Sequence, residues 1–270
     1  GQVLDFQAPP AYWDIGDDYE KRYFREGRIE SCLGLAKTAV LRIDFAATGD
    51  EFPAVWSQPP TALPDPKWVC ASTVLGPAHH YDPENFPEIE RYLAERWILE
   101  RKLARETPPG DFGKWNYGDG HTAWNKELGR WDDLYRTWKG YHHVSGSVPW
   151  LLTLRKGDTE YMHWAVAVSR HLMDIDICNW STPESEAPTT PELQWSRKIK
   201  GGLNDYKGLS HWHAGTRVHD YNTQTEFMLL YFFLTGDRRG LEVATMWGDS
   251  AKKNFRKAHA SREGTGVTSS

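Results

Sequence analysis

The chain has 270 residues with a formal net charge of −5, and its 39% hydrophobic and 26% charged residues are ordinary for a globular protein. That charge gives no reason to expect a nucleic-acid partner, and no segment approaches the roughly 18 apolar residues of a membrane helix, so we expect neither nucleic acid nor membrane as a partner. The aromatic fraction of 13% is high, and such rings either fill a core or form platforms on which sugars stack. Three scattered cysteines match neither a disulfide framework nor a zinc pattern, and we expect free buried thiols.

Residues 1–50 are expected to be the C-terminal strands of a β-domain. From Leu35 to Phe45 apolar and polar side chains alternate, which is the pattern of a strand with one buried face. The first residues carry no signal-peptide pattern and read as the continuation of a longer protein, so the cellular location stays open. Five prolines between positions 53 and 66 then predict an extended linker over residues 51–84.

Helical periodicity begins after the linker. Asn85 and Glu88 form the pattern of a capping box for a helix that the Pro108-Pro109-Gly110 run ends. Further helices are predicted near residues 131–139, 143–156, 159–178, 219–235 and 238–258. Residues 85–258 therefore read as mainly helical, and residues 259–270 as a flexible polar tail.

One unit of this helical region is written twice. An apolar run ends in Gly157-Asp158, and 79 residues later, at 236, another ends in Gly236-Asp237. The glycine is expected to end one helix in a left-handed conformation, and the aspartate is expected to cap the next helix. A helical hairpin cannot bury its apolar face alone, so the repeat predicts hairpins stacked into a solenoid or a closed ring.

Two irregular stretches, residues 108–130 and 181–217, interrupt the helices. Long connections inside a compact domain are usually functional or disordered, and loops held by a rigid scaffold often carry binding and catalytic groups. The first stretch contains Trp115, Asn116, Tyr117, Asp119 and His121. The second, with the residues directly after it, contains His211, Trp212, His213, Arg217, His219, Tyr221 and Asn222. Both combine rings, amides and titratable groups, which favours a binding or catalytic site.

Three runs of residues resemble one known family, the exo-rhamnogalacturonan lyases. They are Trp115–Asp119, Arg170–Asp176, and His219–Tyr221 leading into Leu234–Asp237. The resemblance implies two β-domains followed by an α/α toroid, of which this chain would be a fragment: a short β-sandwich remnant at 1–50 and a partial α/α toroid of helical hairpins at 85–258. It also implies a carbohydrate-active lyase whose partner is an acidic pectic polysaccharide or oligosaccharide, rhamnogalacturonan, cleaved by β-elimination at galacturonate.

β-Elimination sets three tasks that the residues can be tested against. A cation or amide must neutralise the C6 carboxylate, a base must take the C5 proton, and an acid must protonate the departing O4. Arg217, with Asn222 or Asn116, suits the first task, since guanidinium binds carboxylate bidentately. His213, His219 and Tyr221 suit the other two tasks. Arg217 and these three are the predicted catalytic residues. The predicted substrate-binding residues are Trp115, Asn116, Tyr117, Asp119, His121, His143, His211, Trp212 and Asn222, where His143 precedes Asn222 by the repeat offset.

Two other functions stay open. A glycoside hydrolase would need two facing carboxylates, and Asp119 with Asp220 is the pair that the two loops offer. A non-catalytic glycan-binding fragment is the other. No cofactor is expected, although His211 and His213 with His219 or Asp220 could ligate a divalent cation.

Overall fold

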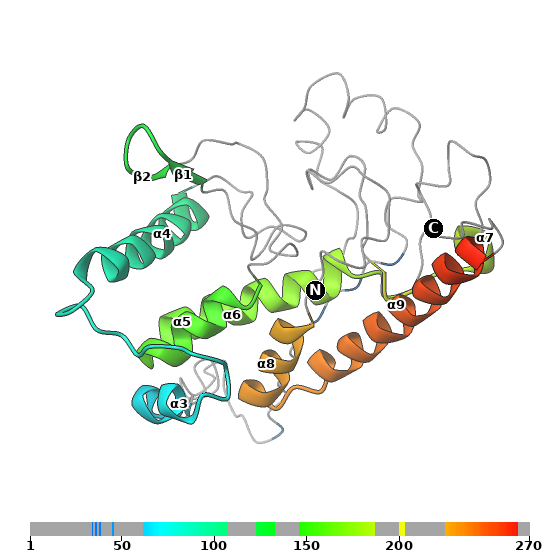
Figure 1. The fold of residues 1–270 in the computed structure, drawn as a ribbon, viewed down its shortest axis with the longest axis horizontal. Helices are drawn as coiled ribbons and strands as arrows, with labels where there is room; N and C mark the ends of the chain where they lie inside the picture. The colour runs from blue at the N-terminus through cyan, green and yellow to red at the C-terminus, as the bar shows by residue number, and fades with distance from the viewer. Residues whose placement is uncertain are drawn as a thin grey trace, which may run out of the picture.

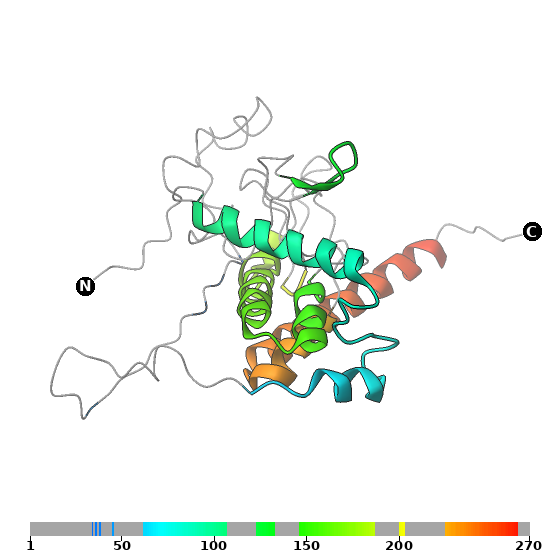
Figure 2. The same cartoon turned by 90° about the vertical axis from the view of Figure 1, so that its left-hand side faces the viewer.

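A computed structural model describes residues 34, 36, 38 and 45 and the ranges 62–106, 123–132, 146–186, 200–202 and 225–263 (Figures 1 and 2). Its helices are α3 (Pro66–Ser72), α4 (Pro87–Glu106), α5 (Val148–Lys156), α6 (Thr159–His171), the π-helix η3 (Leu172–Asp176), α7 (Pro183–Glu186), α8 (Glu226–Thr235) and α9 (Arg239–Glu263). The strands β1 (Ala123–Asn125) and β2 (Arg130–Asp132) form a short antiparallel hairpin. The predicted mainly α class is confirmed for these residues.

The repeated unit forms two helical hairpins, α5–α6 and α8–α9. Gly157 and Gly236 both end their helices in the left-handed region, with φ of 71° and 72°. The Asp158 carboxylate then accepts a hydrogen bond from the Glu160 backbone N–H at 2.9 Å. In the second copy Asp237 accepts from the Arg239 backbone N–H at 3.0 Å. The predicted glycine ends and aspartate caps are therefore confirmed, and only local backbone chemistry is needed to explain them.

The two hairpins pack against each other around one core. Trp150 of α5 is fully buried, and its ring lies edge-on to that of Tyr231 of α8, with ring centres 6.2 Å apart. Leu172, Met173, Phe227 and Met228 add further fully buried side chains to this core. Burial of large apolar side chains stabilises such a core by about 1.5–3 kcal/mol for each side chain. The core thus joins the hairpins into one unit.

Helix α4 lies on one side of the α5–α6 hairpin, whereas α3 and α8 lie on the other (Figures 1 and 2). An ion pair of 2.5 Å between Glu90 of α4 and Arg155 of α5 holds α4 against the hairpin, and the Glu90 side chain is 4% exposed. The predicted capping box is wrong. Asn85 donates to the Asp82 carboxylate at 2.8 Å instead, and the helix begins at Pro87. Its end at Glu106, just before the predicted proline stop, agrees with the sequence.

Three further segments differ from expectation. The helix predicted near 131–139 is wrong at its start, because residues 130–132 form β2 and Trp131 pairs with Trp124 across the hairpin. The predicted linker 51–84 contains α3, which begins at Pro66 where the run of prolines ends. Helix α9 continues to Glu263, past its predicted end and into the stretch expected to be a flexible tail.

The segment around residue 36 approaches the end of the first hairpin. The Ala36 backbone N–H donates to the Asp174 carbonyl at 2.9 Å, and the Asn179 N–H donates to the Gly34 carbonyl at 2.7 Å. Of the strand predicted over 35–45, the described residues Ala36, Thr38 and Phe45 belong to no strand, and the rest lies outside the described residues.

The cysteines of the described ranges are free thiols, as predicted. Cys178 is buried, whereas Cys70 is half-buried. Cys32 lies outside the described residues. None of the helices in these ranges is both long and apolar enough to cross a membrane.

Candidate functional site

The end of the first hairpin carries buried acidic groups. Helix α6 runs directly into the π-helix η3, a form of helix that often marks functional positions. Leu172, Met173 and Ile175 of η3 are each at most 1% exposed, so the whole turn lies inside the protein. Its two carboxylates are therefore buried with it: Asp174 is 0% exposed and Asp176 is 3% exposed. Buried charges require close polar partners.

Asp174 obtains those partners from distant parts of the chain. Its carboxylate accepts from the Thr38 backbone N–H at 2.5 Å and from the Thr38 hydroxyl at 2.8 Å. The guanidinium of Arg239, at the start of α9, lies 3.6 Å from the same carboxylate. Asp174 thus joins the segment around Thr38, the end of η3 and the start of α9.

Asn179 reinforces the same junction. Its side-chain NH2 group donates to the carbonyls of Met173, Asp174 and Ile177 at 3.0, 3.2 and 2.9 Å, at and just beyond the end of η3, where helical carbonyls need partners from outside the helix. Its side-chain oxygen accepts a hydrogen bond from Arg239. The Arg239 guanidinium is therefore held in a fixed position by groups on two sides.

A second polar group links α6 to the second hairpin. The Tyr231 hydroxyl accepts from the Arg170 guanidinium at 3.1 Å and donates to the Asp237 carboxylate at 2.6 Å. Burial, with the hydrogen bond to Asp237, raises the pKa of Tyr231 to about 12. Burial would also raise the pKa of Asp237, but hydrogen bonds from Tyr231 and from the Arg239 backbone N–H hold it below the ordinary 3.8.

His171 and Asp176 form a third buried pair. The His171 Nε2 atom lies 3.6 Å from an Asp176 carboxylate oxygen, and both side chains are at most 4% exposed. Both residues belong to the 170–176 run that carries the family resemblance, although the sequence assigned neither of them a role.

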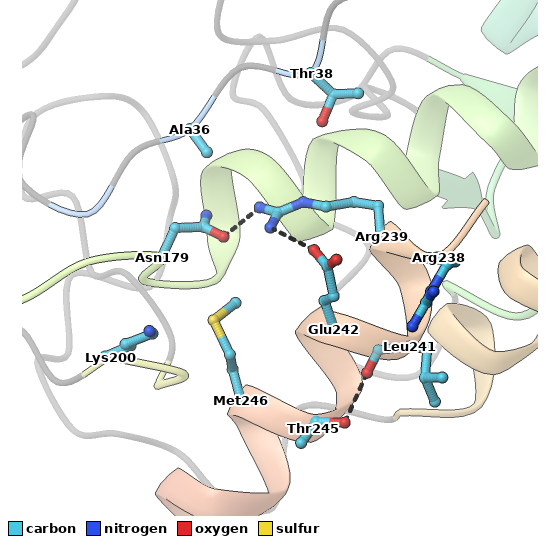
Figure 3. A pocket seen from close by; sticks show the side chains of 10 residues that line it. All are labelled: Ala36, Thr38, Asn179, Lys200, Arg238, Arg239, Leu241, Glu242, Thr245 and Met246. Carbon is cyan, nitrogen blue, oxygen red and sulfur yellow. Dashed lines mark hydrogen bonds and ion pairs between the residues drawn. The ribbon is translucent and has the colours of Figure 1, made fainter.

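A cavity of about 720 Å³ opens beside this junction (Figure 3). The described residues that line it are Ala36, Thr38, Asn179, Lys200, Arg238, Arg239, Leu241, Glu242, Thr245 and Met246. Three of these carry a positive charge and one a negative charge, so this described part of the lining favours an anionic ligand. The volume falls within the range of about 300–1,000 Å³ that is common for small-molecule sites.

The first turns of the two hairpins meet close to this junction. A Cβ atom placed on Gly146, just before α5, would lie 3.0 Å from a side-chain carbon of Leu172 and 3.0 Å from one of Phe227, in the first turn of α8. Helices α5 and α8 are the ones that follow the predicted polar positions His143 and Asn222. The repeat therefore brings its two starting points to one edge of the helical core.

All of the predicted site residues lie outside the described residues. They are the catalytic His213, His219, Tyr221 and Arg217, and the substrate-binding Trp115, Asn116, Tyr117, Asp119, His121, His143, His211, Trp212 and Asn222. No group of three or more His, Cys, Asp or Glu in the described ranges could hold a metal ion.

Sequence reasoning missed the polar lining of the cavity. Charged positions inside the otherwise apolar 170–176 run were a usable signal for Asp174, because such groups are buried only with partners. Nothing in the sequence indicated that Lys200 and Arg238 line one cavity, since that proximity depends on how the hairpins pack.

Comparison with known proteins found no matching family model and no matching curated protein.

Proposed function

We propose that this protein is a polysaccharide lyase that cleaves rhamnogalacturonan-type acidic glycans by β-elimination at a galacturonate residue. The observation that supports the proposal most is the cavity lined by Lys200, Arg238 and Arg239, because an acidic glycan needs cationic partners for its carboxylates. A second support is the meeting of the first turns of α5 and α8, because α5 follows the predicted substrate-binding His143 and α8 follows the segment that carries the predicted catalytic groups.

The proposed architecture is a partial α/α toroid. Hairpins α5–α6 and α8–α9 would be two successive units of its inner and outer helices. The segment around Ala36 and Thr38, bonded to the end of η3, would be the last part of a β-sandwich remnant. Both assignments extend the mainly α fold by the family resemblance.

The proposed reaction needs neither an oxidant nor a co-substrate. A base, His213, His219 or Tyr221, would take the C5 proton of the galacturonate unit while Arg217 neutralises its carboxylate. The electron pair of that C–H bond would form the C4–C5 double bond as the C4–O4 bond breaks. The departing O4 would receive a proton from another of the three groups His213, His219 and Tyr221. The products are an unsaturated uronate and a new hydroxyl end.

Ultraviolet absorbance tests the proposal, because the new double bond is conjugated with the carboxylate. The protein is incubated with rhamnogalacturonan while absorbance and reducing ends are both followed. Elimination predicts that both rise together. New reducing ends without a rise in absorbance would replace the lyase with a hydrolase, and no change in either signal would reject catalysis on this glycan.

A further inference from the structure

We propose that the cavity beside the start of α9 is a binding groove for a linear oligouronide, in which Lys200 and Arg238 each bind one carboxylate. The identity of the ligand rests on the proposed function. The groove itself rests on the described residues: Lys200 and Arg238 lie at opposite ends of the lining, with Arg239 and Glu242 between them (Figure 3).

Two glycines fix the backbone next to the two cationic groups. Gly201 has a φ of 84°, and a Cβ atom there would lie 2.0 Å from the Met246 carbonyl oxygen, so only glycine lets the 200–202 turn lie on the helix. At Gly240 a Cβ atom would lie 2.4 Å from the Met228 carbonyl oxygen, so only glycine lets the first turn of α9 lie on α8. Lys200 comes directly before Gly201, and Arg238 comes two residues before Gly240.

The excess charge of the groove resides at its two ends. The central cation, Arg239, is offset by Asp174 at 3.6 Å and by Glu242 at 3.9 Å. In contrast, no carboxylate of the described ranges lies within ion-pair distance of the Lys200 ammonium or the Arg238 guanidinium. An anion bound at either end would therefore gain an electrostatic attraction that no carboxylate of the described ranges already satisfies.

The walls suit a sugar chain between those ends. Leu241, which is 41% exposed, and Met246 offer apolar surface to the C–H faces of a sugar ring. The Thr38 and Thr245 hydroxyls donate to Asp174 and to the Leu241 carbonyl, and their oxygens can still accept hydrogen bonds from sugar hydroxyls. A ligand with carboxylates on separate sugar units matches this order of groups better than a compact ion with one centre of charge.

Binding measurements test the groove separately from catalysis. The ligand is an α-1,4-linked galacturonate trisaccharide, which has no rhamnose, and its matched control is the galactose trisaccharide, which carries hydroxymethyl groups in place of carboxylates. Isothermal titration calorimetry on the whole chain should detect the first and show at least tenfold weaker binding of the second. Inorganic phosphate, a compact anion, should also bind at least tenfold more weakly.

Three variants locate the contacts. Lys200→Gln and Arg238→Gln should each weaken binding of the galacturonate trisaccharide about tenfold, as expected for a lost hydrogen bond between charged groups. The double variant should lose the product of the two factors, because contacts at separate sites add independently. Lys67→Gln removes the same charge from an exposed position on α3 and should leave the affinity unchanged. Circular dichroism confirms that each variant is folded.

Several results would overturn the groove. They are no binding of the galacturonate trisaccharide, equal binding of the neutral trisaccharide or of phosphate, an effect of Lys67→Gln as large as that of the other variants, or a double variant no weaker than each single one. Binding with no release of unsaturated product from rhamnogalacturonan keeps the groove and rejects the lyase. Release of that product with unchanged affinity in the variants keeps the lyase and rejects the groove.

Discussion

The close approach of α8 and α9 predicts opposite effects for the same substitution at two positions of one helix. At Gly240 a Cβ atom would lie 2.4 Å from the Met228 carbonyl oxygen and 3.2 Å from the Phe232 backbone nitrogen. Ordinary carbon–oxygen contacts are about 3.3–3.6 Å, so the helices must separate by about 1 Å. Neither contact atom can rotate away, because both belong to the backbone. Gly240→Ala should therefore cost about 3 kcal/mol in packing, reduced by at most about 1 kcal/mol of gained helix propensity.

Gly248 is the matched control on the same helix. It is exposed, and a Cβ atom there meets nothing within 4 Å. Gly248→Ala should therefore raise the free energy of unfolding by about 1 kcal/mol through helix propensity alone. Urea unfolding followed by circular dichroism measures both, and the two variants should differ by about 3 kcal/mol at an equal slope. A Gly240→Ala variant as stable as Gly248→Ala would refute the described packing of the second hairpin.

Three other predictions concern acid stability, thiol reactivity and catalysis. Although burial would raise the pKa of Asp237, hydrogen bonding holds it below 3.8. The stability that the ionised Asp237 contributes is therefore complete above about pH 4 and is lost as the pH falls through its folded-state pKa. Tyr231→Phe should reduce the difference between the urea midpoints at pH 7 and pH 3, and an unchanged difference would contradict this origin of the acid sensitivity. Thiol labelling of the native protein, located by mass spectrometry, should modify the half-buried Cys70 much faster than the buried Cys178, whereas equal rates would place both thiols in similar surroundings. Arg217→Ala should lower turnover of rhamnogalacturonan at least roughly a hundredfold, and near-normal turnover would remove Arg217 from the proposed site.

The parts of the fold that the sequence predicts well are those set by local chemistry. Gly157-Asp158 and Gly236-Asp237 determine where one helix ends and the next begins through their own backbone angles and hydrogen bonds. The prediction did not depend on what lies nearby in the fold. The same locality explains why the stop of α4 before Pro108 could be predicted.

The wrong predictions arose where a side chain had two possible hydrogen-bond partners, or where one residue spacing fitted both a helix and a strand pair. Asn85 could cap a helix or bond to Asp82, and in the structure it bonds to Asp82. Trp124 and Trp131 are seven residues apart, a spacing that fits two turns of a helix and also fits facing positions across a hairpin. Their rings pack against Tyr92 of α4, with centres 4.7 and 5.0 Å from its ring, and this tertiary contact favours the hairpin.

The candidate site depends on contacts between residues that are far apart in the sequence. Thr38 bonds to Asp174 across 136 positions, and the cavity brings Lys200 to the first turns of α9. Residue type could indicate that a buried Asp174 needs a partner, but only the packed hairpins identify that partner. The predicted catalytic residues, all outside the described ranges, stay predictions.

Product analysis in heavy-oxygen water tests the central proposal most directly. Rhamnogalacturonan oligosaccharides are incubated with the protein, and the fragments are weighed by mass spectrometry. Elimination takes no oxygen from the solvent, so the account predicts a fragment one water lighter than a hydrolysis product and no heavy oxygen introduced by cleavage. A fragment of full hydrolytic mass that carries solvent oxygen from the cleavage step would contradict the lyase.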